Sequence, residues 1–232
     1  MRRVLITGSN RGLGLGWVRH CLERGDRVFA TCRQPEQAPA LNALRQTAGD
    51  RLRVLPLDVT RAESIAAAAA TVKGFESGLD LLINNAGVGG SQAALAGLDA
   101  ATFMDTYRVN VVGPLLVSQA FAELLAKGVD ALLISITSRM GSIADNGSGG
   151  WYDYRASKAA LNMLNANLAL DLRGQGITAV VLHPGWVQTD MGGAGATLSV
   201  DESVAGMLAV IDGLTLEDSG RFLDWNGQEI PW

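Results

Sequence analysis

The side chains best suited to chemistry are a tyrosine and a lysine four positions apart, Tyr154 and Lys158. On a helix this spacing places both side chains on one face, one turn apart. A phenol has an ordinary pKa of about 10, which is too high for easy proton exchange near neutral pH. A neighbouring ammonium favours the phenolate and lowers that pKa. The pair therefore predicts a general acid and base, with a solvent-facing helical pair as the alternative.

Several hydroxyl side chains lie near the end of the apolar segment 131–137, upstream of Tyr154. Ser138 is the one best placed to bind a carbonyl oxygen. Open parallel sheets bind ligands at the carboxyl ends of their strands, and a hydroxyl there can donate to an oxygen that gains charge. Ser135 and Ser142 compete for this role, and serines at strand ends also cap the backbone.

Asn110 precedes Pro114, which has no N–H for the carbonyl of Asn110. That carbonyl could hold a water, unless the proline only kinks the helix.

A glycine-rich turn follows the first apolar segment and reads TGSNRGLG. Glycines permit a tight turn and let the backbone approach a pyrophosphate, whose charge then lies at a helix N-terminus. The spacing is TGxxxGxG and differs from the GxGxxG fingerprint, and a crowded strand–helix connection is the alternative. The residues predicted to bind the nucleotide here are Gly8, Asn10, Arg11, Gly12, Leu13 and Gly14.

The end of the second apolar segment indicates which nucleotide is bound. A carboxylate there would accept hydrogen bonds from the adenosine ribose and select NAD, but the sequence has Arg33 at this place. A guanidinium can bind a 2′-phosphate through two hydrogen bonds, and Arg11 lies within reach in the glycine turn. The two arginines favour NADP(H) over NAD(H), unless they are ordinary surface residues.

The elements that must position these residues alternate regularly along the chain. Seven short apolar segments without polar alternation are typical of parallel strands covered on both faces. They span 4–7, 27–31, 53–57, 79–84, 131–137, 178–183 and 221–225. Helix-length segments lie between them at 13–24, 36–47, 61–77, 101–127, 151–173 and 201–213. This order predicts an α/β fold in one domain over 1–232, a doubly wound parallel sheet with helices on both faces.

Composition excludes several classes of function. The chain has 232 residues and a net charge of −4, so no basic stripe favours binding to nucleic acid. No uncharged run reaches the ~18 residues of a membrane span, and the first apolar segment is too short for a signal peptide. Cys21 and Cys32 are unclustered and fit a reducing, cytoplasmic location. His20 and His183 have no metal-ligand spacing, so we expect no metal.

These motifs, in this order, resemble the short-chain dehydrogenase/reductase family over essentially the whole chain. The resemblance rests on the glycine turn, Asp58, the segment 84–87, Asn110, Ser138, Tyr154 with Lys158, and Pro184 with Gly185. Segments 183–191 and 220–232 are most similar to the small C-factor and sniffer-like carbonyl reductases. The resemblance implies a Rossmann-type, seven-stranded sheet of order 3-2-1-4-5-6-7. It also implies a homodimer or homotetramer.

The resemblance assigns roles by matching position. Asp58 would bind the adenine amino group with Val59 beside it, and Thr189 with the backbone of Val187 would bind the nicotinamide carboxamide. Lys158 would hold the nicotinamide ribose. Further residues implied to bind the nucleotide are Asn85, Ala86, Gly87, Tyr154, Pro184 and Gly185. One departure concerns Ser138, which precedes Tyr154 by three residues more than is usual, with the extra length in 144–150.

The function expected is an NADPH-preferring oxidoreductase that interconverts a small-molecule carbonyl and an alcohol by hydride transfer. Tyr154 would act as the acid and base, with Lys158, Ser138 and Asn110 in support. The main alternative is a dinucleotide-sensing signalling or scaffold protein with little turnover, as in C-factor-like relatives. A sugar-nucleotide epimerase is less favoured, because the short chain leaves little room for a substrate-binding region.

Overall fold

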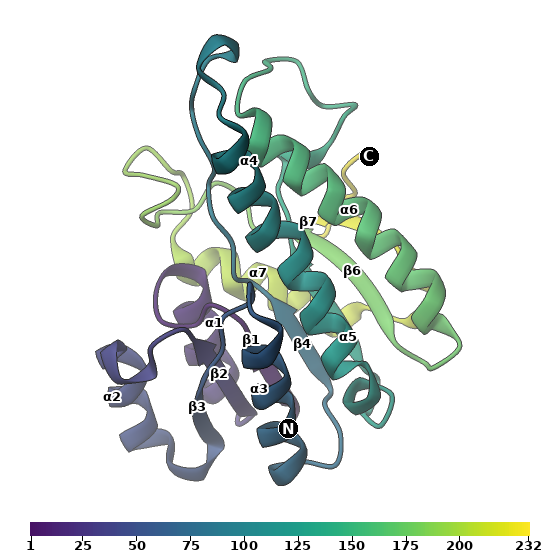
Figure 1. The fold of residues 1–232 in the computed structure, drawn as a ribbon. Coiled ribbons are helices and arrows are strands. Elements are labelled where there is room, and N and C mark those ends of the chain that lie inside the picture. The colour runs from purple at the N-terminus through teal and green to yellow at the C-terminus, as the bar shows by residue number, and fades with distance from the viewer.

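The computed structural model describes residues 1–232, and its seven strands form one parallel sheet (Figure 1). The strands are β1 Arg3–Ile6, β2 Arg27–Cys32, β3 Leu52–Pro56, β4 Leu81–Asn84, β5 Leu132–Ile136, β6 Thr178–His183 and β7 Phe222–Asp224. Their order across the sheet is β3-β2-β1-β4-β5-β6-β7. The predicted α/β fold and strand order are confirmed.

Burial on both faces of the sheet explains why the strands lack a polar alternation. In β1, Val4 and Ile6 belong to a cluster of 24 buried residues on one face. Leu5 between them belongs to a second cluster of 20 buried residues on the other face. Successive side chains of a strand point to opposite faces, so a strand with a hydrophobic core on each side must be apolar throughout.

Helices cover both faces of the sheet (Figure 1). The main helices are α1 Gly12–Glu23, α2 Pro39–Ala48, α3 Ala62–Phe75, α4 Ala100–Tyr107, α5 Gly113–Leu125, α6 Tyr152–Arg173 and α7 Val200–Gly213. Trp17 of α1, Leu41 of α2 and Met207 of α7 pack on one face. Ile65 of α3 and Phe121 of α5 pack on the other. None of these helices combines the length and the hydropathy that a bilayer crossing requires.

The single helix predicted over 101–127 is interrupted, which corrects that expectation. A π-helical turn, Arg108–Val112, separates α4 from α5. The N–H of Gly113 donates to the carbonyl of Arg108, five residues earlier. Pro114 at the start of α5 has no N–H to continue the α-helical pattern, and one wider turn accommodates this. Asn110 lies within the wider turn.

Candidate functional site

The predicted site residues come from connections that follow β1 to β6, and most of them follow β1, β4, β5 and β6. Because all strands are parallel, these connections leave from the same edge of the sheet. The connection after β1 is the glycine turn, and that after β4 holds Asn85 to Gly87. Ser138 follows β5, and Pro184 follows β6. The edge thus gathers residues that lie far apart in the sequence.

The glycine turn is built for close backbone approach. Gly8 has a φ of +68°, and a Cβ there would lie 2.9 Å from the Cα of Ala86. A Cβ on Gly14 would overlap the carbonyl oxygen of Gly8 and lie 2.8 Å from Nδ2 of Asn85. The turn therefore packs on the segment that follows β4 so tightly that these two positions admit only glycine.

The N-terminus of α1 can receive an anion. Its N-cap, Arg11, makes no side-chain capping bond, and the first turn contains no acidic residue. The leading N–H groups of this helix are therefore available to a pyrophosphate, which the positive end of the helix also attracts. Arg11 stays at the surface, where its guanidinium lies 2.8 Å from the carboxylate of Asp190. The cradle and its charge fit a dinucleotide.

Thr7 joins the glycine turn to the segment after β4, a role that the sequence did not reveal. Its Oγ1 accepts hydrogen bonds from the N–H groups of Asn85 and Ala86, each at 3.0 Å. Asn85 returns bonds from Nδ2 to the carbonyls of Thr7 at 2.8 Å and Gly8 at 3.2 Å. Thr7 is 1% exposed, so it braces the turn from beneath.

The adenosine end of the cradle lies at the tips of β2 and β3. Arg33 is exposed after β2, and Asp58 follows β3. Burial alone would raise the pKa of Asp58, but hydrogen bonds from Thr60 and the charges of Arg33 and Arg61 hold it below its ordinary value. Arg33 is thus close enough to Asp58 to act on its charge. Val59 is buried and packs against Gly113, since a Cβ on Gly113 would lie 3.0 Å from the Val59 side chain.

Lys158 is a buried amine with one fixed hydrogen bond. Its side chain lies on α6 and is 6% exposed, and Nζ donates to the carbonyl of Ile136 at 2.8 Å. Burial lowers the pKa of this amine from 10.5 to about 8. Nζ lies 5.7 Å from the centre of the Tyr154 ring, so the two side chains share one face of α6 as their spacing predicts.

Tyr154 differs from the expectation in the direction of its pKa. Burial raises the pKa of the phenol above its ordinary value, and the hydroxyl of Ser138 opposes this by hydrogen bonding. The spacing of the two residues predicted that Lys158 lowers this pKa. The structure instead shows removal from water as the larger effect, because a phenolate loses more hydration than a phenol does.

Among the three candidate serines, only Ser138 acts on Tyr154. Ser138 is 7% exposed, and its Oγ accepts from the N–H of Met140 at 3.1 Å. Ser135 is fully buried, and its Oγ has no hydrogen-bond partner. Ser142 bonds the C-terminal backbone of Trp232 at 3.3 Å. The altered spacing between Ser138 and Tyr154 therefore does not prevent their approach.

Asn110 is tied to the same cluster by its side chain. Its Oδ1 accepts from the N–H of Val88 at 2.9 Å, and its Nδ2 donates to the carbonyl of Val88 at 2.9 Å and to Oγ of Ser157 at 3.1 Å. A Cβ on Gly87 would lie 3.2 Å from Oδ1 of Asn110 and 3.8 Å from Nζ of Lys158. Gly87 therefore lies close to both the amide of Asn110 and the amine of Lys158.

The segment after β6 reaches the glycine turn at Thr189 and Asp190. Gly185 has a φ of +78°, and the carbonyl of Pro184 accepts from Oγ of Ser203 at 2.6 Å. Val187 is 4% exposed. Thr189 accepts from the N–H of Gly192 at 3.1 Å, and its methyl group would lie 3.4 Å from a Cβ on Gly12. Thr189 thus lies beside the glycine turn, at the nucleotide cradle.

Comparison with known proteins agrees with this geometry. The family model for short chain dehydrogenase matches residues 2–197. C-signal of Myxococcus xanthus is 53% identical over 154 residues, which cover 66% of this chain and 93% of that protein.

Solved structures are similar over the whole chain. The NADPH-bound carbonyl reductase from chicken fatty liver is 43% identical with a TM-score of 0.95, over 100% of this chain and 99% of that one. The carbonyl reductase Sniffer of D. melanogaster is 35% identical with a TM-score of 0.96, over 100% of both chains. The chain therefore belongs to the short-chain dehydrogenase/reductase family.

Proposed function

We propose that the protein is an NADPH-preferring carbonyl reductase in which Tyr154 is the proton donor. The observation that carries this proposal is the convergence of Tyr154, Ser138 and Lys158 at the sheet edge that also holds the glycine cradle. The NADPH-bound carbonyl reductase among the similar solved structures supports it. The substrate is a small molecule with an aldehyde or ketone group.

The residues divide the work between binding and proton transfer. A bound nicotinamide supplies the hydride that the carbonyl carbon receives. Tyr154 donates its phenolic proton to the carbonyl oxygen, and Ser138 donates a hydrogen bond to the same oxygen as it gains charge. The ammonium of Lys158 stabilises the phenolate that remains, because an opposite charge nearby favours the ionised form. Asn110 holds the backbone at Val88 beside this group.

Preference for NADPH follows from the charges at the adenosine end. β2 ends at Cys32 and is followed by Arg33 and not by a carboxylate. A 2′-phosphate at this place would meet the guanidinium of Arg33, and Arg11 adds a second positive charge at the glycine turn. The ion pair between Arg11 and Asp190 is exposed, so it opposes such a contact only weakly.

The substrate is apolar in this proposal. Exposed apolar side chains occur on the segments that follow β5 and β6: Ile143 is 79% exposed, Trp186 55% and Met191 56%. Met191 would lie 3.3 Å from a Cβ on Gly89, so the loop after β6 approaches the loop after β4. The ring centre of Trp151 lies 6.4 Å from that of Tyr154, and an apolar group beside a catalytic phenol favours burial of a hydrocarbon portion of the substrate.

The test is NADPH oxidation across a panel of aldehydes, ketones, diketones and quinones. Tyr154→Phe should reduce turnover by at least ~100-fold, because it removes the proton donor, while binding of NADPH stays within about twofold. Tyr152→Phe is the matched control, since Tyr152 is exposed two residues earlier. Normal turnover in Tyr154→Phe would show that another group donates the proton.

A second candidate is cofactor sensing with little turnover, and the similarity to C-signal favours it. Tight NADPH binding without turnover of any carbonyl in the panel would move the assignment to that function.

Assembly into a homodimer or homotetramer also stays a proposal. Exposed apolar residues on α5 and α6, such as Leu115, Met163 and Leu170, support it, and light scattering tests it.

A further inference from the structure

A buried carboxylate that the proposed mechanism does not use stands directly beside the proton donor. Asp153 precedes Tyr154 in the first turn of α6 and is 2% exposed. It forms no ion pair with any lysine, arginine or histidine. A buried carboxylate is costly unless hydrogen bonds replace its hydration. A carboxylate at this place therefore needs hydrogen-bond donors from the structure around it.

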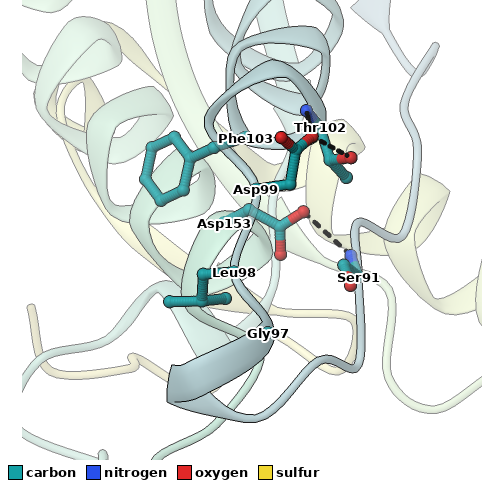
Figure 2. A pocket seen from close by; sticks show the side chains of 7 residues that line it. All are labelled: Ser91, Gly97, Leu98, Asp99, Thr102, Phe103 and Asp153. Atoms are coloured by element: carbon teal, nitrogen blue, oxygen red, sulfur yellow. Dashed lines mark hydrogen bonds between the residues drawn. The ribbon is translucent and has the colours of Figure 1, made fainter.

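Hydrogen bonds from three different elements replace that hydration. Oδ2 of Asp153 accepts from the N–H of Ser91 at 2.8 Å and from the hydroxyl of Thr106 on α4 at 3.0 Å. Oδ1 accepts from the N–H of Tyr154 at 2.8 Å. Figure 2 shows Asp153 with its bond to Ser91, beside a small cavity that Phe103 also lines. One side chain thus joins α6, α4 and the loop after β4.

Asp153 also completes the start of α6. The residue before the helix, Trp151, has a φ of +50° and makes no side-chain capping bond. The first N–H groups of a helix have no partners within the helix. The carboxylate of Asp153 satisfies the N–H of Tyr154, so the backbone that carries the phenol is fixed by its neighbour and not by the N-cap.

The loop after β4 is fitted closely to this carboxylate. Gly90 has a φ of +68°, and a Cβ there would lie 2.7 Å from each oxygen of Asp153. Two residues earlier, Val88 is held by both ends of the Asn110 amide at 2.9 Å. Asn110 and Asp153 therefore hold one loop at two points, on the side where Met191 approaches Gly89.

We propose that Asp153 is a positioning residue that sets the geometry between Tyr154 and the loop over residues 88–91. This inference rests on the proposed carbonyl reductase function. Asp153 does not touch the reacting atoms. It acts by fixing the Tyr154 backbone and the loop that Asn110 also holds, and a displacement of about 1 Å in such a site lowers the rate by roughly 100-fold.

The test compares Asp153→Ala and Asp153→Asn with Asp99→Ala. Asp99 borders the same cavity, but its carboxylate bonds the start of α4, with Thr102 at 2.8 Å and 2.9 Å, and no residue of α6 or of the loop after β4. We expect kcat to fall by 10- to 100-fold in Asp153→Ala. It should fall less in Asp153→Asn, whose amide oxygen still accepts from the loop. NADPH affinity should stay within about twofold in every variant, because the glycine cradle lies elsewhere. Asp99→Ala should keep its kcat.

Hydrogen exchange separates this proposal from the proposed function. In Asp153→Ala, the amides of segment 88–91 and of Tyr154 should exchange faster, and in Asp99→Ala they should not. Unchanged exchange in Asp153→Ala, or an unchanged kcat, overturns the positioning role. A loss of NADPH affinity equal to the loss in kcat overturns it too, because that result indicates general disorder. Absence of turnover in the native chain overturns the reductase function, and the exchange result still decides whether Asp153 holds the loop.

Discussion

Replacing Lys158 with methionine should stabilise the protein while it removes activity. The Lys158 amine is 6% exposed, and burial lowers its pKa from 10.5 to about 8. Each factor of ten in proton affinity is about 1.4 kcal/mol, so the buried charge costs roughly 3 kcal/mol near neutral pH. Methionine removes that cost but leaves the carbonyl of Ile136 without its donor, a loss of about 1 kcal/mol. The net gain expected is about 2 kcal/mol.

The gain should depend on pH in a defined direction. Below pH 8 the amine is charged in both the folded and the unfolded chain, so the full cost is present. Between pH 8 and 10.5 the unfolded chain keeps the proton that the folded chain releases, and native stability rises with pH. The difference between Lys158→Met and the native protein should therefore shrink across this interval. The titration of Lys158 is enough to predict this decrease in the stability difference between the two proteins.

Urea unfolding at pH 7 and at pH 10 measures both effects. Lys127→Met is the matched control, because Lys127 is exposed and pairs with Glu123 at 2.9 Å. Its free energy of unfolding should change by less than about 1 kcal/mol. A Lys158→Met protein that is less stable than the native one at pH 7 would refute the argument. An equal difference at both pH values would refute it too.

Two further predictions concern the nucleotide cradle. Arg33→Glu should weaken NADPH binding by about 10- to 100-fold, because one charge-assisted contact is lost, and it should change NADH binding much less. Fluorescence titration measures the affinity for each nucleotide, and equal losses for the two would contradict the assigned preference. Gly14→Ala should abolish nucleotide binding and destabilise the fold by about 3 kcal/mol or more, because its Cβ overlaps Gly8. Gly147→Ala meets no neighbour within 4 Å and is the control; similar unfolding curves for the two variants would count against the close packing.

Much of the fold could be predicted because local patterns and topology agree. Apolar segments without alternation indicated a buried parallel sheet, and the strands over 27–32 and 178–183 lie almost where they were expected. Tyr154 and Lys158 share a helix face because four residues make about one turn. The helix over 101–127 was wrong in detail, since the π-helical turn depends on how Pro114 and its neighbours pack. The helix propensities of single residues do not predict such a turn.

The sequence by itself determined which residue types were present and which of them shared an element. Tyr154, Lys158 and the glycine turn are local motifs, and local spacing is enough to recognise them. Only the tertiary structure decided which distant groups meet. The choice of Ser138 over its neighbours and the bracing role of Thr7 both depend on contacts between separate strands. The hydrogen bonds of Asp153 to Ser91 and Thr106, which lie 62 and 47 positions away in the sequence, also depend on the tertiary structure.

Burial likewise belongs to the tertiary structure. The sequence placed an amine beside a phenol and suggested a lowered phenol pKa. The fold removes both groups from water, which raises the pKa of Tyr154 and lowers that of Lys158 to about 8. Desolvation depends on every atom packed around a group. Spacing along a helix cannot report it, and so the fold decided the direction of both pKa shifts.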